Sequence, residues 1–247
     1  MACGASPDGQ EVIACGTHVS VTELGTGEDR LLVKLPGQPC SHVRYGSSSD
    51  LAYIVDTSGN VMLFDTLAGE VVKRLQPLAD RIGAASNGTI IVRDPVTRLA
   101  SLWIGDGHEL RRGFDLTGGL CRDIAISRDG RIVAAIHDDG QLRVWNTRNG
   151  RKVNSIQTDM AMVDNWSMIA LDPSGERIAV WINKGKISIM NTRSSEIIEE
   201  LQYADYPKSI HFSPSGDRLA AGDGSGHLEV FRLGLPDSMF DSRGHEG

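Results

Sequence analysis

The sequence predicts an all-β protein made of about six copies of one four-stranded antiparallel sheet. A turn of the Ser-Pro-Asp-Gly type recurs and ends at residues 9, 50, 88, 130, 175 and 216. The interval is about 40 residues, which is the length of a repeat with four short strands. Each turn precedes an apolar run and then a segment in which apolar and polar residues alternate. No stretch sustains the i, i+3, i+4 spacing of an amphipathic helix.

Composition and charge argue against several classes of function. The 247 residues carry a formal net charge of −7, and the densest basic spot is the pair Arg111-Arg112. A nucleic-acid binder concentrates Lys and Arg to displace counterions, so we expect no nucleic-acid partner. No apolar run approaches the roughly 18 residues of a membrane span, so we expect no membrane partner.

The cysteines and the first residues predict a cellular compartment. Cys3, Cys15, Cys40 and Cys121 have wide, irregular spacings, which fit neither a zinc site nor a dithiol motif. We therefore expect small thiols in a reducing compartment. No basic-then-apolar leader opens the sequence, so the expected location is cytoplasmic.

The strand after each turn is a short apolar run, which is typical of a buried strand. The six copies are Glu11–Cys15, Leu51–Val55, Thr89–Val92, Arg131–Ile136, Arg177–Trp181 and Arg218–Ala221. A polar turn follows each copy. These turns include residues 56–59, 93–98, 137–140, 183–185 and 223–226.

The next strand alternates with period 2, which predicts one face buried more deeply than the other. Its copies are His18–Thr22, Asn60–Phe64, Leu99–Trp103, Gln141–Trp145, Lys186–Met190 and His227–Phe231. A tight turn such as Asn146–Gly150 leads to a closing strand. Only five closing strands are evident: Arg30–Leu35, Glu70–Leu75, Glu109–Phe114, Arg151–Gln157 and Glu196–Gln202. A further strand, such as Cys121–Ser127, opens the next unit.

With these landmarks in phase over almost its whole length, the chain resembles a divergent WD-repeat β-propeller. The Trp-Asp dipeptide is degraded, as at Phe64-Asp65 and Trp145-Asn146. The His–Ser–Asp–Trp hydrogen-bond network that the resemblance implies is largely absent, so the blades must rely on apolar packing. We expect Trp103, Trp145 and Trp181 to fill the layers between blades; the alternative is a ligand-stacking site.

Residues 1–233 are predicted to form the propeller, and residues 234–247 a partly disordered tail. The five residues before Ser6 must serve as the innermost strand of the first blade. Three interpretations of the last blade stay open. It lacks an outer strand, or the tail around Ser238–Asp241 supplies a poor one, or further blades lie outside this sequence. The result is a six-bladed ring or an open arc.

No motif predicts catalysis, a metal or a cofactor. No Gly-x-Ser-x-Gly nucleophile turn occurs. Residues 223–226 look like a phosphate loop, but a strand follows them instead of a helix, so they predict a hairpin turn. His137, Asp138 and Asp139 could in principle bind a metal, but their position in the repeat predicts an exposed turn. The protein is predicted not to be an enzyme.

The predicted function is a scaffold or sensor that binds another protein, or a larger complex, through loops on one face of the propeller. Function tends to lie in loops on a rigid scaffold. The proposed contact residues are Arg93, Trp166, Tyr206, His137 and Asp138. Trp166 ends the longest link between blades, Thr158–Trp166. The alternative is a propeller domain associated with a hydrolase or oxidoreductase, which gates it or binds a small ligand in the central channel.

Overall fold

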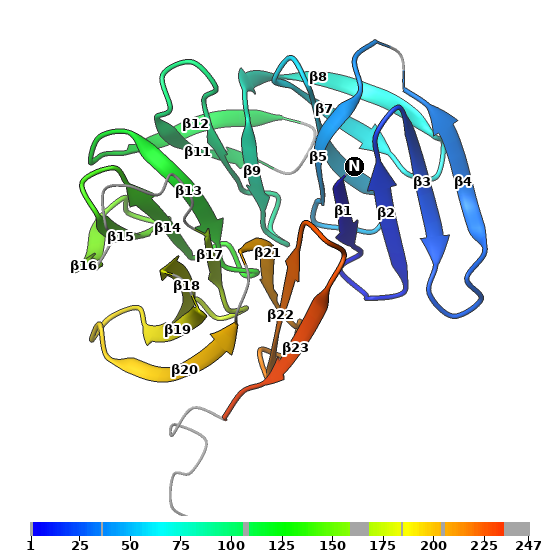
Figure 1. Ribbon diagram of the computed structural model, residues 1–247. Helices are drawn as coiled ribbons and strands as arrows, with labels where there is room; N and C mark the ends of the chain where they lie inside the picture. The colour runs from blue at the N-terminus through cyan, green and yellow to red at the C-terminus, as the bar shows by residue number, and fades with distance from the viewer. Residues whose placement is uncertain are drawn as a thin grey trace, which may run out of the picture.

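The protein is a six-bladed β-propeller. A computed structural model describes residues 2–35, 37–105, 109–158, 168–183, 185–203 and 206–234. These residues form 23 strands in six antiparallel sheets, and none of them is helical. Figure 1 shows the sheets arranged around a central axis, with the first strand of each sheet innermost. No helix able to cross a membrane is found among the described residues.

The strands follow the predicted repeat closely. The first three blades are β1 (Ala2–Ala5), β2 (Glu11–Cys15), β3 (His18–Glu23) and β4 (Asp29–Lys34); β5 (Cys40–Tyr45), β6 (Leu51–Asp56), β7 (Asn60–Asp65) and β8 (Glu70–Leu78); β9 (Arg81–Ala84), β10 (Ile90–Arg93), β11 (Ala100–Gly105) and β12 (Leu110–Leu116). The last three are β13 (Cys121–Ile126), β14 (Ile132–His137), β15 (Gln141–Asn146) and β16 (Lys152–Gln157); β17 (Met168–Leu171), β18 (Arg177–Asn183), β19 (Gly185–Asn191) and β20 (Ile197–Tyr203); β21 (Pro207–Phe212), β22 (Arg218–Asp223) and β23 (Leu228–Arg232).

Each blade is a simple meander, because consecutive strands are neighbours in every sheet. Glycine closes the recurring turn between the first and second strands. In the fourth blade the Gly130 amide donates to the Ser127 carbonyl at 2.9 Å, and Gly130 has φ +71°. That left-handed conformation favours glycine, which explains why five of the six turns end in glycine.

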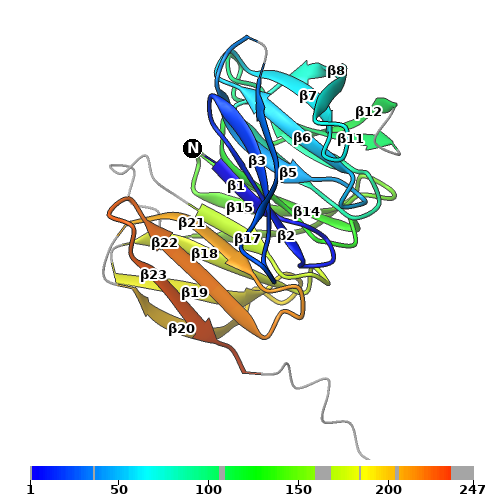
Figure 2. The ribbon, with the colours of Figure 1, turned by 90° about the vertical axis from the view of Figure 1, so that its right-hand side faces the viewer.

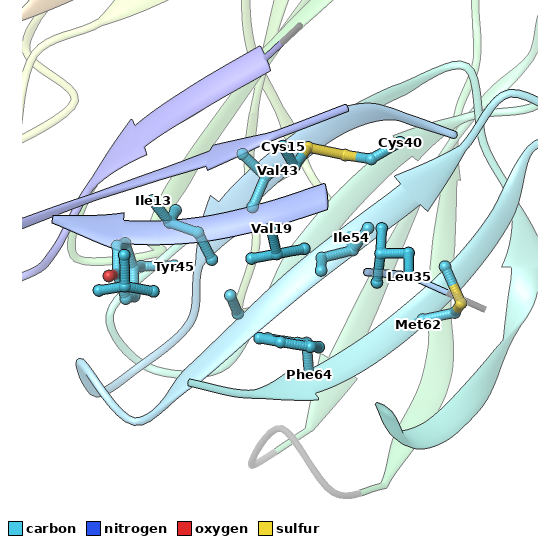
Figure 3. Close-up of a cluster of buried hydrophobic side chains, with 12 residues drawn as sticks. Ile13, Cys15, Val19, Leu35, Cys40, Val43, Tyr45, Ile54, Met62 and Phe64 are labelled. Carbon is cyan, nitrogen blue, oxygen red and sulfur yellow. A yellow bond between two sulfur atoms is a disulfide. The ribbon is translucent and has the colours of Figure 1, made fainter. Parts of the chain in front are cut away.

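Apolar layers between neighbouring blades form the core. Figure 3 shows the layer between the first two blades, where Ile13 and Val19 meet Ile54 and Phe64. Trp145 and Trp181 are almost fully buried in the corresponding layers of later blades, and Trp103 packs against the layer between the second and third blades. The prediction that the tryptophans fill layers between blades is confirmed.

Threonine hydroxyls supply part of the polar support that the degraded repeat motif lacks. Each of three threonines follows the third strand of its blade and donates to a carbonyl in the turn between the first two strands. The bonds are Thr66 to Ser49 at 2.6 Å, Thr147 to Gly130 at 2.6 Å and Thr192 to Gly175 at 2.8 Å. The Asx-Thr sequences therefore tie two turns of one blade together.

A disulfide joins the first two blades. Cys15, the last residue of β2, is bonded to Cys40, the first residue of β5, whereas Cys3 and Cys121 are free. The expectation of four free thiols is therefore wrong for Cys15 and Cys40. Their sequence separation of 25 residues gave no signal, because the tertiary fold alone brings the two strands together. Disulfides persist in oxidising compartments, so the cysteines no longer support a cytoplasmic location.

The sixth blade ends the stack with three strands. First strands pack on one another in the order β1, β5, β9, β13, β17 and β21, but no comparable contact joins the described strands of the sixth and first blades. β1 is the innermost strand of the first blade and β21–β23 form a three-stranded sheet, as expected. Figure 2 shows β23 at the free edge of that sheet. The tail around Ser238–Asp241 lies outside the described residues.

Candidate interaction face

One face of the propeller carries the turns between second and third strands and the links between blades; we call it the loop face. Aspartate carboxylates fix the shape of these turns by accepting hydrogen bonds from backbone amides of the same turn. The Asp56 carboxylate accepts the amides of Ser58 at 2.8 Å and Asn60 at 2.9 Å. Asp94 accepts two amides of its own turn in the same way, from Val96 and Thr97. These hydrogen bonds, that from Thr97 above all, lower the pKa of Asp94. The turns are therefore short and internally fixed.

Arg93, a predicted contact residue, is a structural clamp on this face. Arg93 is 7% exposed, and its guanidinium forms a bidentate ion pair with Asp80 in which both N–O distances are 2.8 Å. It also donates to the carbonyls of Cys121 and Arg122 on β13. Arg93 thus joins the third blade to the fourth and offers little surface to a partner.

Asp138 lies at the same junction between blades. Its carboxylate accepts from Arg122 at 2.7 Å and lies 3.8 Å from Arg98. The neighbouring His137 is the last residue of β14 and is fully buried, so it is not part of the exposed turn that the sequence predicted. Backbone atoms of Leu116 and Gln141 lie near its ring, but neither ring nitrogen has a partner with hydrogen-bond geometry.

The remaining predicted contact residues are separate from this junction. Tyr206 precedes β21 and is 42% exposed, with its ring edge-to-face against Trp181 at 5.3 Å. Trp166 lies outside the described residues. The structure therefore brings Arg93, His137 and Asp138 together between the third and fourth blades and leaves Tyr206 between the fifth and sixth.

A cavity of about 300 Å³ opens between the second and third blades on the loop face. Ser41 and His42 of β5 form one wall, Thr57 and Ser58 the rim, and Asp80 and Arg81 the opposite wall. The sequence did not indicate this cavity. Its nearest signal is a pair of charged residues directly before the apolar part of a first strand, in Asp80-Arg81-Ile82.

Ion pairs hold the opposite wall of this cavity. Asp80 is fixed by Arg93, and Arg81 lies 4.0 Å from Asp123 on β13. Asp123 also accepts the Ile169 amide at 2.9 Å. Burial raises the pKa of Asp123, while that hydrogen bond and Arg81 oppose the rise. These contacts connect the third, fourth and fifth blades.

The cavity does not present a nucleophile with a competent base. Ser41 Oγ lies 3.2 Å from His42 Nδ1, but the hydroxyl donates to the carbonyls of Val55 at 3.1 Å and Asp56 at 3.2 Å. Burial, followed by the charges of Arg81 and Arg44, lowers the pKa of His42 to about 4. A base that weak does not activate a serine hydroxyl near neutral pH. Among the described residues, no three His, Cys, Asp or Glu side chains gather closely enough to hold a metal ion.

Comparisons with known proteins give distant relatives. No protein-family model matches the sequence. Autophagy-related protein 16 of Arabidopsis thaliana is 25% identical over 190 residues, which cover 72% of this chain and 36% of that protein. Protein groucho of Drosophila melanogaster is 26% identical over 151 residues, which cover 60% of this chain and 20% of the relative.

A third relative carries the repeat in its name. WD repeat-containing protein SL1-17 of Schistosoma mansoni is 25% identical over 146 residues, which cover 59% of this chain and 48% of that protein. The chain thus spans between a fifth and a half of the length of these three relatives. With six blades in phase, the chain has the β-propeller fold, and at low sequence identity it is similar to WD-repeat proteins.

Proposed function

We propose that this protein is a non-catalytic scaffold that binds a partner protein through its loop face. The cavity between the second and third blades carries the proposal. It is concave, its rim is exposed at Thr57 and Ser58, and its far wall is fixed by the Arg93–Asp80 ion pair. A preorganised surface of this kind binds at a low cost in conformational entropy.

The size and polarity of the cavity favour a protein side chain over a small cofactor. A volume of about 300 Å³ lies at the small end of the range for ligand pockets. Asp80 and Arg81 present opposite charges on one wall, so a polar side chain of a partner finds both an acceptor and a donor there.

The relatives support a binding role in general terms. None of the three names describes an enzyme. Since the chain matches only part of each relative, the binding partners of these relatives are not assigned to this chain. The chemistry of Ser41 and His42 supports the absence of hydrolysis by this pair at the loop face.

The test is affinity capture from extract of the source cells, with the intact chain and with a cavity variant. Thr57→Arg and Ser58→Arg together place two long side chains at the rim, where both native residues are exposed. Ala68→Arg is the matched control, because Ala68 is an exposed turn residue of the same blade on the opposite face. Melting temperatures of all three proteins should agree.

We expect a partner that the wild type and Ala68→Arg retain in equal yield and the double variant loses. Equal retention by the double variant would remove the cavity from the proposed binding face. If the wild type retains no protein, the scaffold role fails, and a screen of small molecules against the central channel becomes the next experiment.

A further inference from the structure

Arg44 brings a positive charge to the innermost strands of the propeller. It is the penultimate residue of β5 and is partly exposed. Its Nη1 donates to the Val43 carbonyl at 2.8 Å and to the Cys3 carbonyl of β1 at 3.3 Å. Among the described residues, none accepts a hydrogen bond from Nε or Nη2 of Arg44. The edge of the guanidinium that binds a carboxylate or a phosphate through two parallel hydrogen bonds is therefore not used by these residues.

The position of Arg44 in the repeat is small in four of the other blades. It lies two residues before the residue whose amide closes the first turn of its blade, as the Gly46 amide does by donating to the Leu51 carbonyl at 2.8 Å. The six equivalent residues are Gly4, Arg44, Gly83, Ala125, Ala170 and His211. Glycine and alanine have no side-chain atoms beyond the β-carbon. At this level of the first strands, therefore, only Arg44 and His211 carry polar side-chain atoms.

His211 indicates that water reaches an enclosed space beside Arg44. The residue is exposed, and yet burial, followed by the charge of Arg44, lowers its pKa to about 4. A side chain that water reaches while protein surrounds it lines an internal channel. Figure 1 shows the first strands, β21 among them, around the central axis where this channel lies. Near neutral pH the ring of His211 is uncharged and can donate one hydrogen bond to an anion.

The carboxylates on the first strands and on the links that enter them are engaged with other arginines. Asp123 acts on Arg44 through its charge, but its carboxylate lies 4.0 Å from Arg81. Asp80 is held by Arg93 in the bidentate ion pair described above. In this group of five side chains, three arginines stand against two aspartates. The charge of Arg44 is the one that lacks a carboxylate partner of its own.

The environment of Arg44 strengthens its attraction for an anion. Burial lowers the pKa of Arg44, and the charges of Cys3 and Asp123 oppose this effect only in part. Removing a cation from bulk water costs free energy unless an anion pairs with it. Because the effective dielectric constant is lower there than at the protein surface, an anion gains more from Arg44 than from an exposed arginine.

A second arginine spans the end of the channel that lies opposite the loop face. Arg128 is in the first turn of the fourth blade, and its guanidinium donates to the Pro7 carbonyl in the first turn of the first blade. These two blades stand on opposite sides of the six-bladed ring, so the bond crosses the central axis. Arg44 and His211 are penultimate residues of their strands and lie next to this end. Arg128 thus adds a positive charge at the same end of the channel.

We propose that this end of the central channel binds a small oxyanion, a carboxylate or a phosphate, through the Nε and Nη2 atoms of Arg44. The His211 ring donates a further hydrogen bond to the same anion. Glycine and alanine at the four other equivalent positions place no longer side chain against it. The site is separate from the cavity between the second and third blades and does not depend on the scaffold function proposed for the loop face.

Isothermal titration calorimetry of the intact chain with sodium phosphate and with sodium succinate tests the site near neutral pH at constant ionic strength. We expect saturable binding of at least one of the two anions, with a Kd of about 1 mM. Preference for phosphate would assign a phosphoryl group to the ligand, and preference for succinate a carboxylate. No saturable binding of either anion up to about 20 mM would overturn the proposal.

Arg44→Gln removes the charge and the planar fork but keeps an amide that can donate to the neighbouring carbonyls. We expect it to weaken binding of the preferred anion about tenfold or more, because a charge-assisted bidentate contact is lost. Arg148→Gln is the matched control, since Arg148 is an exposed turn residue of the fourth blade. Its binding should stay within about twofold of wild type, because an exposed charge outside the channel is screened.

Cys3→Asp tests the site without changing Arg44 and applies if Arg44→Gln does not fold. Cys3 is exposed and its charge acts on Arg44, so an aspartate there supplies an anion from the chain itself. We expect anion binding to weaken about tenfold in Cys3→Asp, and to change less than about twofold in Cys3→Ser, which stays neutral. Binding that both Arg44→Gln and Cys3→Asp leave intact would place the anion elsewhere and overturn the proposal.

Discussion

Arg93 shows how one side chain connects neighbouring blades of this propeller. Its ion pair with Asp80 fixes the link that enters the third blade, and its bonds to the Cys121 and Arg122 carbonyls reach the fourth. A guanidinium offers five donors in a planar fork, so it can serve a carboxylate and two carbonyls together. Such a residue belongs to the scaffold that holds the loop face.

Arg93→Ala should lower the free energy of unfolding by about 1–3 kcal/mol, because it leaves the Arg122 carbonyl and the partly exposed Asp80 carboxylate without this donor. Denaturant unfolding measures the loss. Arg112→Ala is the control, since Arg112 pairs with Asp115 at an exposed site where a pair contributes about 0–1 kcal/mol. Equal effects of the two substitutions would contradict the role of Arg93 as a clamp.

His137 should make stability fall as the pH is lowered from about 7 to about 5. Burial, followed by the charge of Arg143, lowers the pKa of its ring below the ordinary value of 6.5. The unfolded chain therefore takes up a proton that the folded chain does not, and the stability present above pH 6.5 is lost as pH falls toward the lowered pKa. His42, whose pKa burial lowers to about 4, acts in the same direction.

His137→Leu tests this assignment. The free energy of unfolding of the variant should depend less on pH between about 7 and about 5 than that of the wild type. At about pH 8 the ring is neutral in the folded and the unfolded state. Any difference in the free energy of unfolding between wild type and variant at that pH therefore comes from packing alone. An unchanged pH dependence would show that other groups, such as His42, determine it.

At the scale of strands and turns, each repeat is built from strands whose side chains alternate between two faces, joined by a recurring type of turn. Val61 and Leu63 face the third blade, while the alternating residues Met62 and Phe64 face the first. Both faces of a blade are therefore apolar, and each needs a neighbour. The disulfide between β2 and β5 adds a covalent link across the first of these layers.

Reduction of Cys15–Cys40 should destabilise the protein by about 3 kcal/mol, because the bond closes a loop of 25 residues in the unfolded chain. Denaturant unfolding with and without reductant measures the change. The double variant Cys15→Ala, Cys40→Ala should be insensitive to reductant. A wild type that is equally insensitive, with both thiols labelled before unfolding, would show that the bond does not form in solution.

At the scale of the whole molecule, the propeller has a first and a last blade that differ. The first blade ends the stack with small and polar residues such as Ser20 and Thr22, whereas the last blade exposes Leu228 and Val230. In a stacked repeat, a polar outer face is typical of a capping unit. The first blade fits that description and the sixth does not.

Hydrogen exchange should therefore be uneven around the propeller. The amides of β22 and β23 should exchange faster than those of β14 and β15, because no described strand pairs with the outer edge of β23 and its residues Leu228 and Val230 are exposed. Exchange read by mass spectrometry compares the two hairpins in one sample. Equal protection would show that another element covers the sixth blade in solution.

The sequence by itself determined the repeat, the strands and their turns. Period-2 alternation and glycine at left-handed turn positions are local properties, so they can be recognised in the amino-acid sequence alone. For that reason β1 and the three-stranded last blade were predictable from the residues before Ser6 and after Phe231.

Only the tertiary structure decided which polar residues are buried, which cysteines pair and what each end of the stack exposes. Arg93 and His137 stand at strand ends, where the sequence does not show whether a neighbouring blade covers them. Cys15 and Cys40 lie in different blades, and Leu228 has the same sequence context as Leu142. Their different environments follow from contacts between distant segments, which alternation within one strand does not encode.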